Sequence, residues 1–126
     1  MSLQTIQTPL APAPLGHYAQ GVLANGILYV SGQLPFDPAT GTLPLGIEAQ
    51  ARQVLRNLLA IVEAAGGTRA SITQVQVFIP DIAHWPAVNT IYSDVMGDHR
   101  PARTVVPTRE LHHGALVEVN AIAHIH

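Results

Sequence analysis

The 126-residue sequence contains no cysteine and no lysine. Without cysteine the chain has no disulfide framework, no thiolate nucleophile and no cysteine-ligated zinc site. Without lysine it has no amine for Schiff-base catalysis. Its cations are six arginines, and its formal net charge is −2, so the sequence provides no basic surface that would neutralise a run of phosphates. We therefore expect no nucleic-acid partner.

Charge of either sign is scarce. Charged residues make up 11% of the chain, against about 25% in an average soluble domain, which leaves little charge for the surface of an isolated monomer. This scarcity favours an oligomer, although a monomer rich in alanine and glycine is the alternative. The length and the 48% apolar content fit a single domain over residues 1–126.

Long apolar runs are also missing. The opening stretch MSLQTIQTPL has no basic region followed by an apolar core, and no run approaches 18 apolar residues. We expect neither secretion nor a membrane partner, and a cytoplasmic location is the default expectation.

The first half of the chain predicts an arm, a hairpin and a helix. Three prolines and a glycine over residues 8–18 predict an extended arm that lies on a neighbouring surface or frays. Asn25-Gly26 between two apolar runs predicts a hairpin with strands over 20–24 and 27–33. Strict alternation would place Ile27, Tyr29, Ser31 and Gln33 on one face of the second strand.

Apolar residues recur at helical spacing from Ile47 to Ala65, with Gln53 among the polar residues of the opposite side, and Gly66-Gly67 ends this helix. The run SITQVQVFIPDI then predicts a strand that Pro80 stops. A second helix over about 84–96 and strands over about 102–107 and 115–125 complete the chain.

The predicted order is β-β-α-β-α-β-β, which indicates an α+β fold with a single sheet and two helices on one face. No third layer is present in the sequence to bury apolar residues on the other face. Packing against other copies of the chain would cover them.

Two charged residues belong to predicted strands, Arg103 at the start of one and Glu118 within another. Arg103 begins the β-branched run of RPARTVVPT, where its guanidinium could fork onto a carboxylate or form an ordinary surface ion pair. Glu118 interrupts the apolar run ALVEVNAIA and needs a partner. It is either half of an internal salt bridge, with Arg103 as one candidate, or a general base at the rim of a cavity.

The remaining polar candidates are less distinctive. Tyr18 follows the arm and either presents its hydroxyl to a ligand or packs by its ring. Ser31 could donate a hydrogen bond in a pocket, but no histidine and aspartate follow in the order of a serine triad. His112 and His113 are adjacent and cannot both face one ion from a strand, and His124 and His126 lack a third ligand. We expect no metal site.

Several motifs together carry a family resemblance. The segments GHYAQG, VSGQLPFDPATGTLP, QARQVLRNLLAIVEAAG, VFIPDIAHWPAVNTIY, RPART and VEVNAIA resemble, in collinear order from about residue 5 to residue 124, the reactive-intermediate deaminase family, RidA, formerly called YjgF. The resemblance implies a chorismate-mutase-like α+β fold, a homotrimer with sites in the clefts between subunits, and cofactor-free hydrolysis of 2-imino acids to 2-oxo acids and ammonia.

The resemblance also implies roles for single residues. Arg103 falls on the arginine that binds the substrate carboxylate, and Glu118 on the glutamate that holds and activates the attacking water. Tyr18, Ser31 and Asn89 fall on further positions of the family motifs, as substrate-binding residues.

Two departures from the family pattern concern the pocket. Val105 replaces a cysteine that many members carry, and the connection SDVMGDHRPAR is shorter than in some relatives, so the preferred imine side chain stays open. Two other functions also stay open: a non-catalytic trimer that binds small carboxylates or regulates a partner, and a ribonuclease, which the charge disfavours. Retention of both Arg103 and Glu118 favours the enzyme.

Overall fold

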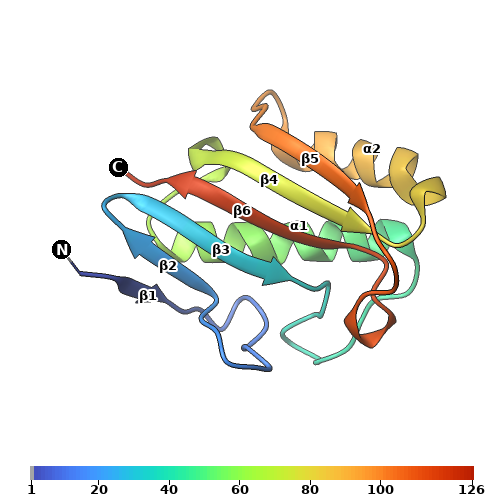
Figure 1. Cartoon of the computed structure of the whole chain (residues 1–126), viewed down its shortest axis with the longest axis horizontal. Helices are drawn as coiled ribbons and strands as arrows, with labels where there is room; N and C mark the ends of the chain where they lie inside the picture. Colours follow the sequence, from blue (N-terminus) through green and yellow to red (C-terminus); the bar gives the residue numbers. More distant parts are fainter. Residues whose placement is uncertain (1) are drawn as a thin grey trace.

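The computed structural model describes residues 2–126 and consists of one six-stranded mixed sheet with two α-helices on one of its faces (Figure 1). The strands lie in the order β1-β2-β3-β6-β4-β5 across the sheet. The strands and α-helices are β1 Gln4–Ile6, β2 Gly21–Ala24, β3 Ile27–Gln33, α1 Ile47–Ala64, β4 Ile72–Ile79, α2 Trp85–Met96, β5 Ala102–Pro107 and β6 Glu118–His124. Short 3₁₀ turns are η1 Arg69–Ser71, η2 Ile82–His84 and η3 His112–Gly114. No helix in residues 2–126 is both long and apolar enough to span a membrane.

The predicted order of elements is right from β2 onward but lacks the first strand. β1 adds a short edge strand that pairs antiparallel with β2, with Thr5 opposite Val22. Only three residues form it, and two of them are polar, so it gave no alternating pattern to detect.

One pair of strands differs from the rest in direction. β4 and β5 run parallel, whereas the other neighbouring pairs are antiparallel. A parallel pair requires a crossover, and α2 supplies it on the helical side of the sheet (Figure 1). This crossover makes β5, which carries Arg103, an edge strand beside α2.

The core lies between the helices and the face of the sheet that they cover. Val75 and Val77 of β4 pair with Ala121 and Val119 of β6, and all four side chains are buried there. Leu58 belongs to the helical side of this core, from α1. The opposite face has no helix, and on it Tyr29 of β3 remains 50% exposed. The expected uncovered face is therefore present.

The arm over residues 8–18 is attached to its own chain rather than frayed. The Gln20 side chain, which is buried, donates from Nε2 to the carbonyl oxygens of Thr8, Ala11 and Pro12 at 3.1, 3.2 and 2.9 Å. Its Oε1 accepts from the Thr8 amide at 2.7 Å. One amide side chain thus replaces the backbone pairing that the prolines prevent.

A bulge near the end of β3 changes the predicted alternation. Val30 pairs with Ala121 of β6, but Gln33 pairs with Val119, so three residues of β3 span two of β6. The extra residue turns Gln33 toward the covered face, where it is buried, while Ser31 stays on the other side. The prediction that Ser31 and Gln33 share a face is therefore wrong.

Polar residues of α1 fasten the loops that border the sheet. Asn57 is fully buried and donates from Nδ2 to the carbonyl oxygens of Leu34 and Phe36 at 3.1 and 2.9 Å. Gln53, placed on the outer side by the sequence, is buried and donates to the Asn57 side chain at 2.8 Å. These bonds fix the segment that follows β3.

Candidate active site

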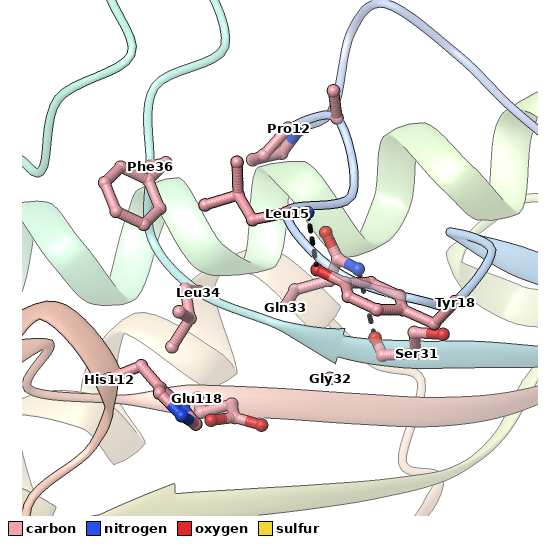
Figure 2. Close-up of a pocket in the computed structure, with 11 residues that line it drawn as sticks. Pro12, Leu15, Tyr18, Ser31, Gly32, Gln33, Leu34, Phe36, His112 and Glu118 are labelled. Carbon is pink, nitrogen blue, oxygen red and sulfur yellow. Dashed lines mark hydrogen bonds between the residues drawn. The ribbon is translucent and has the colours of Figure 1, made fainter.

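Glu118 lies at the start of β6 on a cavity of about 260 Å³ (Figure 2). The walls come from the arm, the end of β3 with the segment after it, and the η3 turn. The lining residues are Pro12, Ala13, Leu15, Tyr18, Ser31, Gly32, Gln33, Leu34, Phe36, His112 and Glu118. Three of the predicted site residues, Tyr18, Ser31 and Glu118, therefore meet in one pocket.

The two hydroxyl groups of this pocket are held by backbone groups. The Ser31 hydroxyl donates to the carbonyl oxygen of Ala19 at 2.6 Å, which leaves its lone pairs free to accept from a ligand. The Tyr18 oxygen accepts from the Leu15 amide at 3.4 Å, so its own proton remains available. Tyr18 is 49% exposed, as a residue that meets a ligand from the rim would be.

Gly32 makes room for the Glu118 carboxylate. A Cβ atom built at Gly32 would collide with Oε2 of Glu118. The β3 bulge places this glycine opposite the start of β6, and any larger residue would displace the carboxylate. A residue without a Cβ atom is thus required at position 32 of the VSGQ segment, and the sequence alone did not indicate this requirement.

The environment of Glu118 disfavours its charged form. Burial raises the pKa of the Glu118 carboxyl above its ordinary value, and the nearby His112 offsets part of this effect. A carboxylate that is poorly solvated and faces a cavity is a stronger proton acceptor than one on an open surface. Glu118 can therefore serve as a general base.

Arg103 lies in a different place: it belongs to β5, and its side chain packs against α2. Its guanidinium carbon stands 4.7 Å from the ring centre of Trp85 and 4.8 Å from that of Tyr92, and its Nη1 donates to Oδ1 of Asn89 at 3.1 Å. Cation–π contacts and one hydrogen bond orient the planar group while most of its N–H donors stay free. Arg103 is exposed and can grip a carboxylate that approaches from outside the chain.

A second cavity of about 430 Å³ adjoins this arginine, and Asn89 and Tyr92 are among its walls. The Tyr92 hydroxyl is buried and has no hydrogen-bond partner within residues 2–126. Burial raises the pKa of Tyr92, with a smaller opposing effect of Arg103, so the phenol stays protonated at neutral pH. It is an unused donor beside the arginine.

The two groups cannot meet within one chain. Arg103 is aligned with Val75 of β4 and, like it, points to the helical side, whereas Glu118 is aligned with Phe78 on the uncovered side. The two also lie roughly 10 Å apart across the sheet and about 10 Å along it, from the usual strand and residue spacings. The internal salt bridge considered for this pair is therefore wrong. Within residues 2–126 the single ion pair joins Arg52 to Asp94.

The histidine pairs form no metal centre in the described part of the chain. The ring centres of His124 and His126 lie 4.6 Å apart with the planes tilted by 59°, and no group of three potential ligands occurs in residues 2–126. His112, by contrast, lines the Glu118 cavity, and the sequence considered it only as a metal ligand.

Comparison with known proteins places this arrangement in a family. The family model described as Endoribonuclease L-PSP matches residues 8–125. A 2-iminobutanoate/2-iminopropanoate deaminase from Escherichia coli strain K12 is 41% identical, and the match covers 95% of this chain and 96% of that protein. The chain belongs to the L-PSP/RidA family. A RutC family protein from Pyrococcus horikoshii is 38% identical over 96% of the chain and 97% of its own length.

Solved structures of this family share the fold. RidA from the Antarctic bacterium Psychrobacter sp. superposes with a TM-score of 0.94 at 40% identity, over 97% of this chain and 99% of the other. TdcF from Escherichia coli, crystallised with bound serine, gives a TM-score of 0.95 at 35% identity over 98% and 99% of the two chains. The predicted fold class, a chorismate-mutase-like sheet with two helices, is confirmed.

Proposed function

We propose that this RidA family member is a cofactor-free hydrolase that converts 2-iminobutanoate and 2-iminopropanoate to 2-oxo acids and ammonia. It would act in a homotrimer whose sites combine the Arg103 half-site of one protomer with the Glu118 pocket of its neighbour. The observation that carries the proposal is that Arg103 and Glu118, on opposite faces of one sheet, each border a cavity without facing each other. The deaminase name of the 41% identical relative supports the reaction.

The arginine half-site would fix the substrate by its carboxylate. A planar guanidinium donates two parallel hydrogen bonds to a carboxylate, and the contacts to Trp85, Tyr92 and Asn89 hold it ready for this. The protonated Tyr92 hydroxyl is close to this group. Because the charge of the arginine is permanent, binding would persist over the whole physiological pH range.

The Glu118 pocket would carry out the hydrolysis. The Glu118 carboxylate accepts a proton from a water molecule while the water oxygen bonds to C2 of the protonated imine, and the C=N π electrons move to nitrogen. The carbinolamine then collapses: its nitrogen takes the proton back from Glu118, the C–N bond breaks with its electron pair moving to nitrogen, and the hydroxyl proton passes to solvent water as the C=O bond forms, which releases the 2-oxo acid and ammonia. Tyr18 and Ser31 supply hydrogen-bonding groups for the polar intermediate.

The trimer would bring the uncovered face and the β5 edge of each copy against its neighbours. β5 ends the sheet with exposed Arg103 and Thr104, and the face without a helix carries half-exposed Tyr29. The low charge of the chain also suits buried contact between copies. Such contact would close the two half-sites into one water-poor cleft.

The direct test supplies the purified protein with an imino acid generated in place by an amino-acid oxidase and follows the 2-oxo acid. We expect release well above the spontaneous rate, and a panel of amino acids would reveal the preferred side chain. Binding of 2-oxo acids without any acceleration would instead support the alternative, a carboxylate-binding or regulatory trimer.

The name of the family model raises ribonuclease as another activity. The chain offers no lysine and a net charge of −2, which gives little attraction for an RNA backbone. We expect no cleavage of RNA. Binding that weakens steeply between low and moderate salt, together with cleavage, would contradict this.

A further inference from the structure

His112 is an ionisable neighbour of Glu118 in the same pocket. It belongs to the η3 turn that precedes β6, and its side chain lines the same cavity as Glu118. Figure 2 shows the imidazole beside the Glu118 side chain, and both side chains line the same cavity. The mechanism above does not use it.

Two hydrogen bonds hold the segment that directly follows His112. The Ala115 amide donates to the His112 carbonyl oxygen at 3.2 Å, and Ala115 itself is buried. The Leu116 amide donates to Oε1 of Gln50 on α1 at 2.8 Å. The backbone of the turn that carries His112 is therefore held next to β6 and α1, beside the pocket.

The adjacent histidine differs in its surroundings. His113 adopts a left-handed backbone conformation with φ of 61°, and its ring contacts the edge of Phe36 at 5.2 Å between ring centres. It does not line the Glu118 cavity. Of the two adjacent histidines, only His112 therefore lies beside the Glu118 carboxylate.

Few titratable groups face Glu118. Tyr18 comes from the arm and His112 from η3, while the lining residues of β3 are uncharged, as is Phe78, the partner of Glu118 on β4. Among the described residues of one chain, His112 is thus the only group of this pocket that can carry a positive charge. In the proposed trimer, a neighbour's Arg103 would be the second cation.

A positive charge on the imidazole beside Glu118 would act against protonation of the carboxylate. Burial pushes the carboxylate toward its neutral form as the pH falls, and a cation alongside opposes this. A charged His112 would therefore help to keep the base ionised at acidic pH.

We propose that His112 is a positioning residue for Glu118: in its charged form it keeps the carboxylate ionised and turned toward the attacking water, and so extends turnover to acidic pH. This inference rests on the proposed imine hydrolysis. In this proposal His112 influences the charge of Glu118, and no covalent bond is made or broken at its imidazole.

The test compares His112→Asn with His113→Asn. Asparagine removes the titratable ring in both, and it tolerates the left-handed backbone at position 113. The assay measures kcat/KM for imine hydrolysis between pH 5 and pH 8, with the spontaneous rate subtracted. We expect His112→Asn to lose about 3- to 10-fold more activity at pH 5 than at pH 8, and His113→Asn to keep the wild-type profile. Equal loss at every pH, or no change in the profile, would overturn the proposal.

A second readout does not depend on catalysis. The side-chain carboxyl of Glu118 can be titrated by NMR in protein labelled with ¹³C-glutamate, assigned through Glu118→Gln. We expect the Glu118 pKa to rise in His112→Asn and to stay unchanged in His113→Asn. If the wild-type protein hydrolyses no imine, the proposed function fails, yet this titration still decides whether His112 controls the charge of Glu118. An unchanged Glu118 pKa in His112→Asn overturns the proposal.

Discussion

Arg103 and Glu118 point to opposite faces of the same sheet, one toward α2 and the other toward the uncovered side. The guanidinium is oriented by two aromatic rings and the carboxylate is partly desolvated, and each group borders its own cavity. Joined across two copies of the chain, the two half-sites provide what imine hydrolysis needs: an anchor for a carboxylate and a base for a water molecule.

Arg103→Lys should lower kcat/KM by about 100-fold, because an ammonium group cannot form the two-pronged contact with a carboxylate. The side chain is exposed, so the thermal unfolding midpoint should change little. Arg109→Lys, on an exposed loop, is the matched control and should retain full activity. Steady-state kinetics on imines generated in place check both. A fully active Arg103→Lys enzyme would show that the arginine does not bind the substrate.

Glu118→Gln should reduce turnover by roughly 100-fold or more, because the amide cannot accept the proton of water. The thermal stability of this variant at neutral pH should instead increase. A carboxyl whose pKa is raised by folding binds its proton more tightly in the folded state, so its favourable contribution exists at low pH and is lost as the pH rises through the folded-state pKa. The neutral amide avoids this loss. The melting temperature at pH 7 should therefore rise, and the gain should vanish near pH 4.

Gly32→Ala should impair activity by about 10-fold or more while leaving the fold intact, since the added methyl group meets only the mobile end of the Glu118 side chain. Catalysis suffers because the carboxylate is pushed from its place. A double-mutant cycle with Glu118→Asp tests this cause. The shorter acid leaves room for the methyl group, so the double variant should be little worse than Glu118→Asp alone. Fully additive losses would mean that Gly32 acts in another way.

Asn57→Ala should destabilise the protein by about 2–4 kcal/mol, because the partly buried carbonyl oxygens of Leu34 and Phe36 lose their donor. Arg56→Ala, one residue earlier on the exposed side of α1, should cost less than about 0.5 kcal/mol. Urea unfolding monitored by circular dichroism measures both. A similar cost for the two variants would show that Asn57 does not fasten the segment after β3.

The strongly periodic elements were predictable from the sequence. Helix α1, predicted over 47–65, ends one residue earlier, and β4, β5 and α2 lie where expected. The apolar residues of β6 form the core as predicted, with Val119 and Ala123 buried. These elements follow from local spacing, which a single sequence displays directly.

Other features depend on contacts between distant segments. The β3 bulge reverses the face of Gln33 because of its pairing with β6, and Asn57 is buried on an otherwise predictable helix because loop carbonyl oxygens need a donor. Likewise, the sequence singled out Arg103 and Glu118 but not their opposite orientations. Those follow from the insertion of β6 between β3 and β4, which no local pattern indicates.

The sharpest test of a shared site mixes two inactive variants, Arg103→Ala and Glu118→Gln, by joint unfolding and refolding or by co-expression. If each site takes its arginine and its glutamate from different protomers, random assembly leaves about one site in four with both residues intact. We predict recovery of about a quarter of wild-type imine hydrolysis in the mixture, against almost none in either variant alone. A mixture that forms mixed oligomers but stays as inactive as its components would contradict the account.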